Sequence, residues 1–444
     1  MPCALHCAPT LPAKATLNHP ASLLALLFSV ALVISLLIRF WLATRQMRHV
    51  AANSGAVPLA FADTVTLDAH RRAARYTLAK GSFGLWAMAF SAAILIGWTL
   101  LGGLGVLNNA IREAVQPTYG DMAYQLALLA AFVVIGCVLD VPFDLYSTFR
   151  IEQDFGFNRM TWKLYLVDAL KGFVLGALIG LPLAAGMLWI MSSTGALWWL
   201  WAWGAWMGFN LLALVLYPTV IAPLFNTFKP LTDASLEARV QSLMAKCGFL
   251  AKGFFVMDGS KRSAHANAYF TGFGSAKRVV FFDTLLAKLL PGEVEAVLAH
   301  ELGHFKHRHV LKRIASMFAI SLAGFAVLGW MSHRIWFYTA FGVQPSMTAP
   351  NDAVALLLFM LIVPVFSFFV SPLFAGLSRR HEFQADAYAC AHANGRELSS
   401  ALLKLYKDNA STLTPDPLYA RFYYSHPPAA ERLAAMQALD LKPS

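Results

Sequence analysis

The segment His300-Glu301-Leu302-Gly303-His304 has the residue types and the spacing needed to bind a metal ion and activate water. Residues four apart lie on one face of a helix, so both imidazoles can reach a single ion. Glu301, beside them, could take a proton from the attacking water and deliver it to a leaving amine. The preceding residues predict a helix that begins at Pro291. The alternative interpretation is an amphipathic helix with two surface histidines.

A catalytic zinc ion has three protein ligands and one open position, so a third ligand must come from elsewhere in the chain. The candidate is Glu382, in the hydrophilic run at residues 379–386, and the neighbouring His381 is the alternative. Asp386 lies on the same helical face as Glu382. It could accept the N–H of a ligand histidine and fix its tautomer. We expect His307 and His309, which flank basic residues, to be interfacial anchors rather than ligands.

The elements that position these residues must be embedded in lipid. Of the 444 residues, 58% are hydrophobic and only 13% are charged, whereas soluble domains have about 25% charged residues. So few charges cannot cover the surface of a soluble core. The composition therefore excludes a cytosolic enzyme, a disordered chain and a nucleic-acid binder, and it predicts a membrane protein. The five cysteines form no C-x-x-C pair and predict neither a disulfide framework nor a cysteine metal site.

Uncharged runs predict seven transmembrane helices. The longest run, residues 172–228, would make a helix of ~85 Å, far beyond one ~30 Å crossing, so it must turn back, at Ser192–Gly195. The other five runs are 20–38, 81–111, 122–139, 314–332 and 353–377. The predicted organisation is a tail at 1–19, helices one to five at 20–228, a catalytic segment at 229–313, helices six and seven at 314–377, and a C-terminal catalytic segment at 378–444.

The basic residues predict the orientation of these helices. Of the 35 Lys and Arg residues, 32 fall on one side of the seven crossings, and the exceptions are Lys14, Arg112 and Arg334. Cytoplasmic loops carry such an excess, so we predict that the N-terminus is outside and that both catalytic segments and the C-terminus are cytoplasmic. The net charge of +11 is therefore an orientation signal rather than a nucleic-acid surface.

Three runs rich in aromatic and β-branched residues follow the fifth helix, at Gly253–Asp258, Ala268–Phe273 and Lys277–Asp283. Turn residues separate them, which predicts a small β-hairpin or sheet whose edge could pair with an extended peptide. The predicted fold class is thus an all-α polytopic membrane protein with seven transmembrane helices. A cytoplasmic-side zinc-protease subdomain carries the small sheet.

Four motifs in order resemble those of the type I CAAX prenyl endopeptidases, the seven-span zinc metalloproteases of membranes. They are His265–Phe270, His300–His304, Glu382–Asp386 and Ser425–Pro428. The chain departs from the expected pattern at Ala266, Phe305 and His381, which removes no catalytic group but leaves the substrate open.

The resemblance implies a role for each candidate residue. One zinc ion per chain would be bound by His300, His304 and Glu382, and Glu301 would be the general base. Asp386 would support a ligand histidine. The remaining candidates are the substrate-binding residues Asn267 and His265 and the oxyanion-stabilising residues His426 and Arg432.

The leading hypothesis is an integral-membrane zinc metalloendopeptidase that acts near the cytoplasmic face on peptide or protein substrates. One substrate class is a prenylated C-terminal CAAX peptide. The other is damaged membrane protein, cleaved without prenyl dependence. A different class of function is a non-catalytic transporter or structural membrane protein, which predicts no stoichiometric zinc. The expected membrane is the bacterial inner membrane, or the endoplasmic reticulum in a eukaryote.

Overall fold

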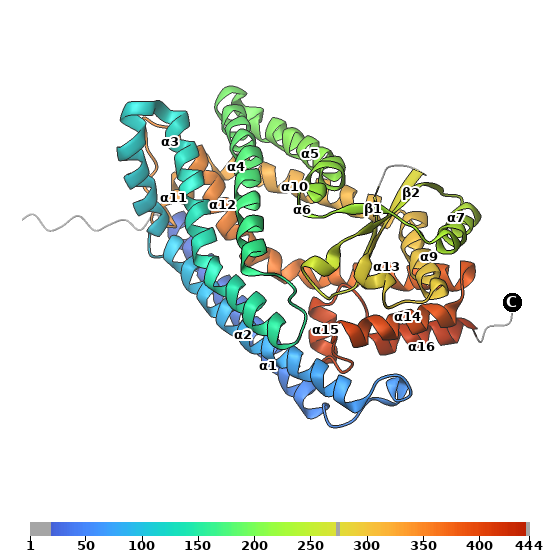
Figure 1. Cartoon of the computed structure of the whole chain (residues 1–444). Helices are drawn as coiled ribbons and strands as arrows, with labels where there is room; N and C mark the ends of the chain where they lie inside the picture. Colours follow the sequence, from blue (N-terminus) through green and yellow to red (C-terminus); the bar gives the residue numbers. More distant parts are fainter. Residues whose placement is uncertain (1–18, 272–275, 441–444) are drawn as a thin grey trace, which may run out of the picture.

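Seven long apolar helices form most of the chain (Figure 1). The computed structural model describes residues 19–271 and 276–440, so most of the predicted tail lies outside the described residues. The predicted seven membrane helices are confirmed. They are α1 (His19–Ala52), α2 (Leu67–Trp98), α3 (Gly103–Tyr146), α4 (Trp162–Ser193), α5 (Trp198–Leu216), α10 (His309–Met331) and the pair α12 (Asp352–Ser367) and α13 (Ser371–His392).

The predicted bounds of the second span, 81–111, are wrong, because two helices share this uncharged run. α2 ends at Trp98 and α3 begins at Gly103, after Gly102 has taken a positive φ of 75°. The turn contains no charge, so a search for uncharged runs cannot detect it. The predicted hairpin at Ser192–Gly195 is found, since α4 ends at Ser193 and Gly195 has φ +65°.

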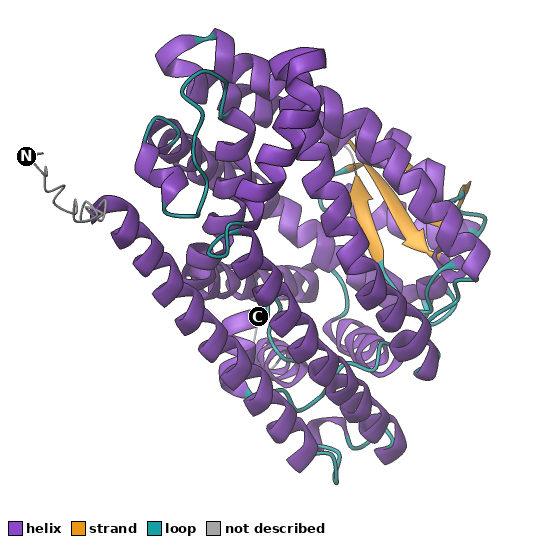
Figure 2. Cartoon of the chain, turned by 90° about the vertical axis from the view of Figure 1, so that its left-hand side faces the viewer, coloured by secondary structure: helices purple, strands orange, loops and turns teal. Residues whose placement is uncertain are grey.

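The hydrophilic segments form a second layer beside the helices. This layer contains a small sheet (Figure 2). Its strands have the order β1-β2-β4-β3, in which β2 and β4 are parallel and the other pairs are antiparallel. The predicted small sheet is confirmed, with one further strand, β1. The strands are β1 (Phe228–Pro230), β2 (Leu250–Met257), β3 (Ala268–Thr271) and β4 (Ala276–Phe282). β3 lies at an edge, and the predicted strand Ala268–Phe273 extends into residues outside the described part.

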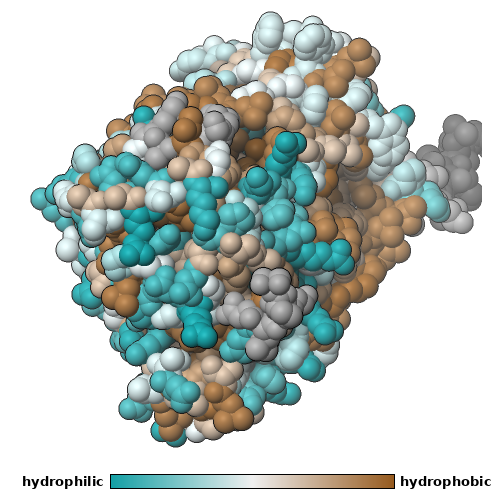
Figure 3. Space-filling view, turned by 90° about the vertical axis from the view of Figure 1, so that its right-hand side faces the viewer, coloured by the Kyte–Doolittle hydropathy of each residue, from teal (hydrophilic) through white to brown (hydrophobic). Residues whose placement is uncertain are grey.

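Helices cover this sheet and complete the hydrophilic layer. They are α7 (Ala234–Lys246), α8 (Asp283–Leu286), α9 (Pro291–Lys306), α14 (Gly395–Asp408), α15 (Pro417–Tyr423) and α16 (Ala429–Asp440), and the short helices α6 (Ala222–Phe225) and α11 (Ile335–Thr339) belong to the loops. The hydrophobic core of this layer includes Val240, Val279, Leu298 and Met436, which are all nearly inaccessible to solvent. Hydrophilic side chains gather on the face that carries α7, α14 and α16 (Figure 3).

The membrane helices differ in how far they are buried within the protein. In the most apolar stretches of α2, α3 and α4, only 6% of the residues are buried within the protein, against 44% in the stretch that includes α12. Most side chains in these stretches of α2, α3 and α4 are therefore not covered by the rest of the protein, whereas α12 is packed among other helices. Only the short helix Phe368–Val370 separates α12 from α13, so the chain passes from a membrane helix packed within the protein into the hydrophilic layer.

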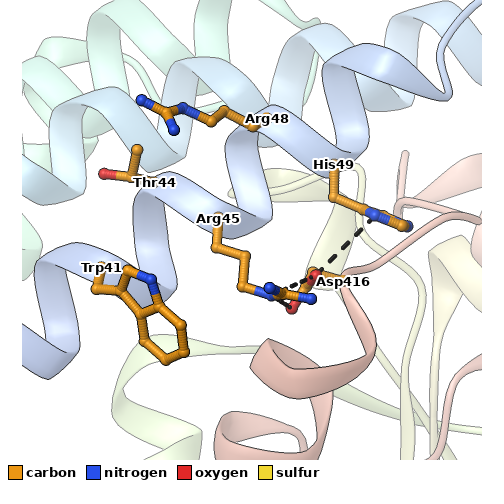
Figure 4. Close-up of a pocket in the computed structure, with 6 residues that line it drawn as sticks. All are labelled: Trp41, Thr44, Arg45, Arg48, His49 and Asp416. Carbon is orange, nitrogen blue, oxygen red and sulfur yellow. Dashed lines mark hydrogen bonds and ion pairs between the residues drawn. The ribbon is translucent and has the colours of Figure 1, made fainter.

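Among the ion pairs that join the membrane helices to the hydrophilic layer within the described residues, two involve an arginine. Arg262, after β2, donates to both carboxylate oxygens of Asp168 on α4, at 2.8 and 3.0 Å. Arg45 on α1 lies 2.8 Å from Asp416, whose carboxylate also accepts the amide N–H of Leu418 and so caps α15. In the close-up, Arg45 and the neighbouring His49 both point toward Asp416 (Figure 4).

Asp416 provides a prediction of pH-dependent stability. Burial by itself raises the pKa of Asp416, but hydrogen bonds from the amide of Tyr419 and from Arg45 outweigh it, so the folded-state pKa lies below its ordinary value. This contribution to stability is complete above the unfolded-state pKa of about 4 and is lost as the pH falls through the folded-state pKa. We expect Asp416→Ala to lower the free energy of unfolding by about 1–2 kcal/mol at pH 7.

The measurement is the denaturation midpoint of the detergent-solubilised wild type and variant at pH 7, 5 and 3.5. The difference between the denaturation midpoints of the wild type and Asp416→Ala should be smaller at pH 3.5 than at pH 7. Asp416→Asn is the matched control, because asparagine still caps the helix but cannot form an ion pair with Arg45. It should lose less stability than Asp416→Ala. A difference between wild type and Asp416→Ala that is the same at all three pH values would contradict this account.

Candidate active site

The helix that carries the two motif histidines, α9, is fixed at its first turn. It begins at Pro291, as predicted. The buried carboxylate of Glu293 accepts the amide N–H of Leu290 at 2.8 Å, the hydroxyl of Ser400 at 2.6 Å and the ammonium of Lys404 at 2.7 Å. Since Ser400 and Lys404 belong to α14, these bonds fix both the start of α9 and its position against α14.

A close helix crossing brings the third candidate ligand to α9. A Cβ atom at Gly303 would lie 3.0 Å from Cα of Ala385 and 3.1 Å from Cβ of Tyr388, both on α13. A larger residue at Gly303 would therefore push the two helices apart. The glycine between the motif histidines thus allows α13 to approach closely enough for Glu382 to face them.

Three ligating groups converge at this crossing. His300, His304 and Glu382 each offer one ligand atom, and these atoms all lie within 4.8 Å of one another. Nε2 of His300 lies 3.5 Å, and Nε2 of His304 3.4 Å, from the carboxylate of Glu382. Oε2 of Glu382 is buried and makes no hydrogen bond within the described chain. Nη1 of Arg432, at 3.8 Å, is too far away to donate a hydrogen bond to this oxygen, so a buried carboxylate oxygen beside two imidazoles is left to bind a cation. This set of groups fits a metal ion.

A buried pair supports the first histidine. Nδ1–H of His300 donates to Asp386 at 2.8 Å. Arg432 donates to the same carboxylate through Nε at 2.8 Å and Nη2 at 2.6 Å. Burial lowers the pKa of His300, but the bonds to Asp386 and Glu382 outweigh it and raise this pKa to about 9. The pocket therefore stabilises positive charge at the position where the ligand atoms meet.

Two further candidates lie beside the cluster. Nε2 of His426, whose side chain is 62% exposed, lies 3.4 Å from Glu382. Glu301 is half-buried on α9 and makes no hydrogen bond or ion pair with any residue that the structure describes. Its carboxylate is thus available to a water molecule or a substrate.

The two candidate substrate-binding residues lie outside the group of three. Asn267, just before the edge strand β3, is exposed, and its side chain accepts the amide N–H of Ala268 at 2.8 Å. His265 lies 3.4 Å from Glu152, at the end of the third membrane helix, and 3.2 Å from the side-chain oxygen of Asn409. His265 also lines a cavity of about 700 Å³ between α1, α2 and the C-terminal segment.

The expectation that His309 is an interfacial anchor is wrong. His309 is only 4% exposed, and its Nδ1 lies 3.0 Å from Nδ1 of His304. His307, in contrast, is exposed. His381, the alternative third ligand, stacks on the ring of His309 at 3.9 Å. A break between two helices brings His309 to this position, and no feature of the sequence marks that break.

Comparison with known proteins places the chain in a family. Residues 46–227 match the model of the CAAX prenyl protease N-terminal region with five membrane helices, and residues 230–440 match the model of peptidase family M48. A CAAX prenyl protease 1 from Saccharomyces cerevisiae is 31% identical, over 97% of this chain and 98% of its own length. The chain belongs to peptidase family M48. Other M48 relatives of similar coverage are CAAX prenyl protease 1 homologues from Oryza sativa, 32% identical over 89% of this chain and 93% of their own, and Homo sapiens, 31% identical over 93% and 96%.

The fold agrees with that of a solved structure. The crystal structure of S. mikatae Ste24p superposes with a TM-score of 0.86 at 30% identity, covering 93% of this chain and 98% of that one. The resemblance to CAAX prenyl endopeptidases, and the classification as a membrane metallopeptidase with peptide or protein substrates, are therefore confirmed. Membership of M48 also implies a bound metal ion, which the cluster of His300, His304 and Glu382 fits. The non-catalytic transporter hypothesis is set aside.

Proposed function

We propose that this protein is a zinc endopeptidase that cleaves near the C-terminus of prenylated proteins at the cytoplasmic face of the membrane. The observation that carries the proposal is the convergence of His300, His304 and Glu382, because the buried Oε2 of Glu382 makes no hydrogen bond to any residue that the structure describes. Two imidazoles and one carboxylate, with one position left open, are the ligand set of catalytic zinc in peptidases. The names of the M48 relatives support the prenylated substrate.

The chain's own groups account for the remaining chemistry. A zinc ion bound by His300, His304 and Glu382 would polarise the scissile carbonyl and acidify its water. Glu301 takes the proton of the attacking water and delivers it to the leaving amine. His426, exposed beside Glu382, donates an N–H to the carbonyl oxygen as negative charge develops there.

Arg432 acts from the buried side of the site. Its Nε and Nη2 are committed to Asp386, and its Nη1 lies 3.8 Å from Glu382. Asp386 holds His300 with its Nε2 toward the metal position. Arg432 thus stabilises negative charge at the site and fixes the carboxylate that orients His300.

The substrate peptide binds in extended form beside β3. An edge strand has unpaired backbone groups that an added strand can satisfy, and β3 lies at the edge of the sheet. Asn267, directly before β3, holds the peptide backbone at the end of that strand. The cavity that His265 lines offers room for the rest of the substrate, and Tyr406, in its wall, donates to the carbonyl of Pro427, next to His426.

The orientation proposed from charge places this chemistry in the cytoplasm. The strong excess of basic residues on the side that carries both catalytic segments supports an N-terminus outside and a cytoplasmic C-terminus. The proposed boundaries between the tail, the membrane helices and the catalytic segments, at residues 19, 228, 313 and 377, follow the ends of the uncharged runs. The membrane is the inner membrane in a bacterium and the endoplasmic reticulum membrane in a eukaryote.

The first test measures metal and cleavage together. We expect the purified wild type to contain about one zinc ion per chain, and Glu382→Gln to lose most of it, because the amide cannot supply a charged ligand. Removing metal with a chelator should abolish cleavage of a farnesylated CAAX peptide, and added zinc should restore it. A wild type that cleaves the peptide equally well without metal would overturn the zinc mechanism.

The second test separates the two substrate classes. Farnesylated and unmodified versions of one peptide are compared at equal concentration in detergent micelles. We expect kcat/KM to be at least tenfold higher for the farnesylated peptide, because burying a prenyl chain adds favourable binding free energy. Equal values would favour a quality-control protease that acts on membrane proteins without prenyl dependence.

A further inference from the structure

Each of the two motif histidines has a hydrogen-bond partner on the side away from the metal position, but the partners differ. Nδ1 of His300 faces the carboxylate of Asp386. Nδ1 of His304 faces Nδ1 of His309 at 3.0 Å, and Nε2 of His309 lies 2.8 Å from Oε1 of Gln384. The second histidine is thus held by a neutral relay of two side chains rather than by an ion pair.

A break in the backbone brings the relay together. On one continuous helix, His304 and His309 would point about 140° apart, so their rings could not meet. The chain instead ends α9 at Lys306 and begins α10 at His309. Between them Arg308 has φ 55° and ψ 34°, in the left-handed region that costs a non-glycine residue about 1–2 kcal/mol. The break therefore costs stability, and it places the ring of His309 against His304.

The donors and acceptors of the relay fix one arrangement of protons. The oxygen of Gln384 can only accept, so Nε2 of His309 carries its hydrogen. A neutral imidazole has a single N–H, so Nδ1 of His309 is an acceptor. Nδ1 of His304 must then donate, which leaves its Nε2 with a free lone pair on the side that faces Glu382. That is the tautomer a metal ion requires.

Packing holds the relay in place. His309 is 4% exposed, and its ring stacks on the ring of His381, with 3.9 Å between the ring centres and 12° between the ring planes. The ring of His307, which is exposed, lies farther away, with 5.5 Å between the ring centres. His381 and Gln384 flank Glu382 on α13. The same helix therefore supplies a candidate ligand and both groups that hold His309.

We propose that His309 and Gln384 are positioning residues that fix the metal-binding tautomer of His304. The inference rests on the proposed metal centre. It adds to that centre two residues that contact neither the metal position nor the substrate.

The test is the zinc affinity of full-length variants in detergent, measured by competition with a chromogenic chelator. We expect His309→Leu to weaken zinc binding about 10- to 100-fold, the usual effect of removing such a partner. Gln384→Leu should weaken it about tenfold, because His309 can then reorient its hydrogen. His309→Asn should stay within about threefold of wild type, since Oδ1 of asparagine takes the place of Nδ1 and can only accept.

His307→Leu is the matched control, because His307 stacks on the same ring but makes no hydrogen bond to His304 within the described chain. It should bind zinc as the wild type does. If His309→Leu does not fold, the comparison of Gln384→Leu with wild type still decides. Wild-type affinity in His309→Leu and Gln384→Leu, or an equal loss in His309→Asn and His309→Leu, overturns the relay. A wild type that binds no zinc instead overturns the proposed metal centre itself.

Discussion

Replacing Glu301 by glutamine should lower kcat for a farnesylated CAAX peptide by about 10²- to 10⁴-fold while zinc stays bound. An amide of the same size cannot accept the proton of the attacking water, and general-base catalysis contributes a factor of this order. Glu301 makes no hydrogen bond or ion pair with the described residues, so its replacement should not affect the fold. The measurements are kcat, zinc content and the denaturation midpoint of the same preparation.

Glu295→Gln is the control for this experiment. Glu295 lies on the same helix and pairs with Arg239 at the surface, at 3.0 Å. Its loss should leave kcat unchanged and alter stability by less than about 1 kcal/mol. If Glu301→Gln cleaves at the wild-type rate, another group is the base and the assignment of Glu301 is wrong.

The largest expected effect on stability belongs to Arg432→Met. Arg432 is 6% exposed and Asp386 only 1%, and two hydrogen bonds join them. The substitution leaves the buried Asp386 carboxylate without its cation, and breaking such a pair costs about 3–5 kcal/mol. We expect a correspondingly lower denaturation midpoint for the detergent-solubilised variant.

A double variant distinguishes an unpaired charge from lost packing. Combining Arg432→Met with Asp386→Leu removes both charges, so no buried charge is left uncompensated and much of the stability should return. Zinc binding should not return, because His300 still lacks its acceptor. If the double variant is as unstable as the sum of the two single variants, the ion pair does not explain the effect.

The parts of the molecule that follow from local chemistry could be predicted from the sequence. Uncharged runs identify seven membrane helices because charge is excluded from lipid, and a four-residue spacing places His300 and His304 on one face. The family resemblance added residues that spacing alone leaves open, such as Asn267 and His426. The structure brings Glu382 to the histidine pair, as the spacing and the resemblance together led us to expect.

Other parts depend on contacts between distant residues, which one sequence does not reveal. The turn at residues 99–102 contains no charged residue, so the charge pattern predicts one span at 81–111 where the structure has the end of one helix and the start of the next. The short strand β1 is defined by its pairing with β2 rather than by its composition. Similarly, nothing local to Arg45 indicates that its partner is Asp416, 371 residues away. The sequence does not predict the position of His309, because its burial follows from a helix break that the neighbouring residues do not indicate.

The continuity of α13 fixes the distance between the apolar part of this helix and the candidate metal site. Leu373, 68% exposed on the apolar part of this helix, and Glu382 belong to one uninterrupted helix, about 13 Å apart along its axis. One continuous helix keeps these two residues at a fixed separation. A prenylated substrate of the proposed kind, held in the same bilayer by its lipid chain, would present each peptide bond at a height set by its distance from that chain. Under the proposed function, the distance of a peptide bond from the lipid chain would therefore contribute to the choice of the bond that is cleaved.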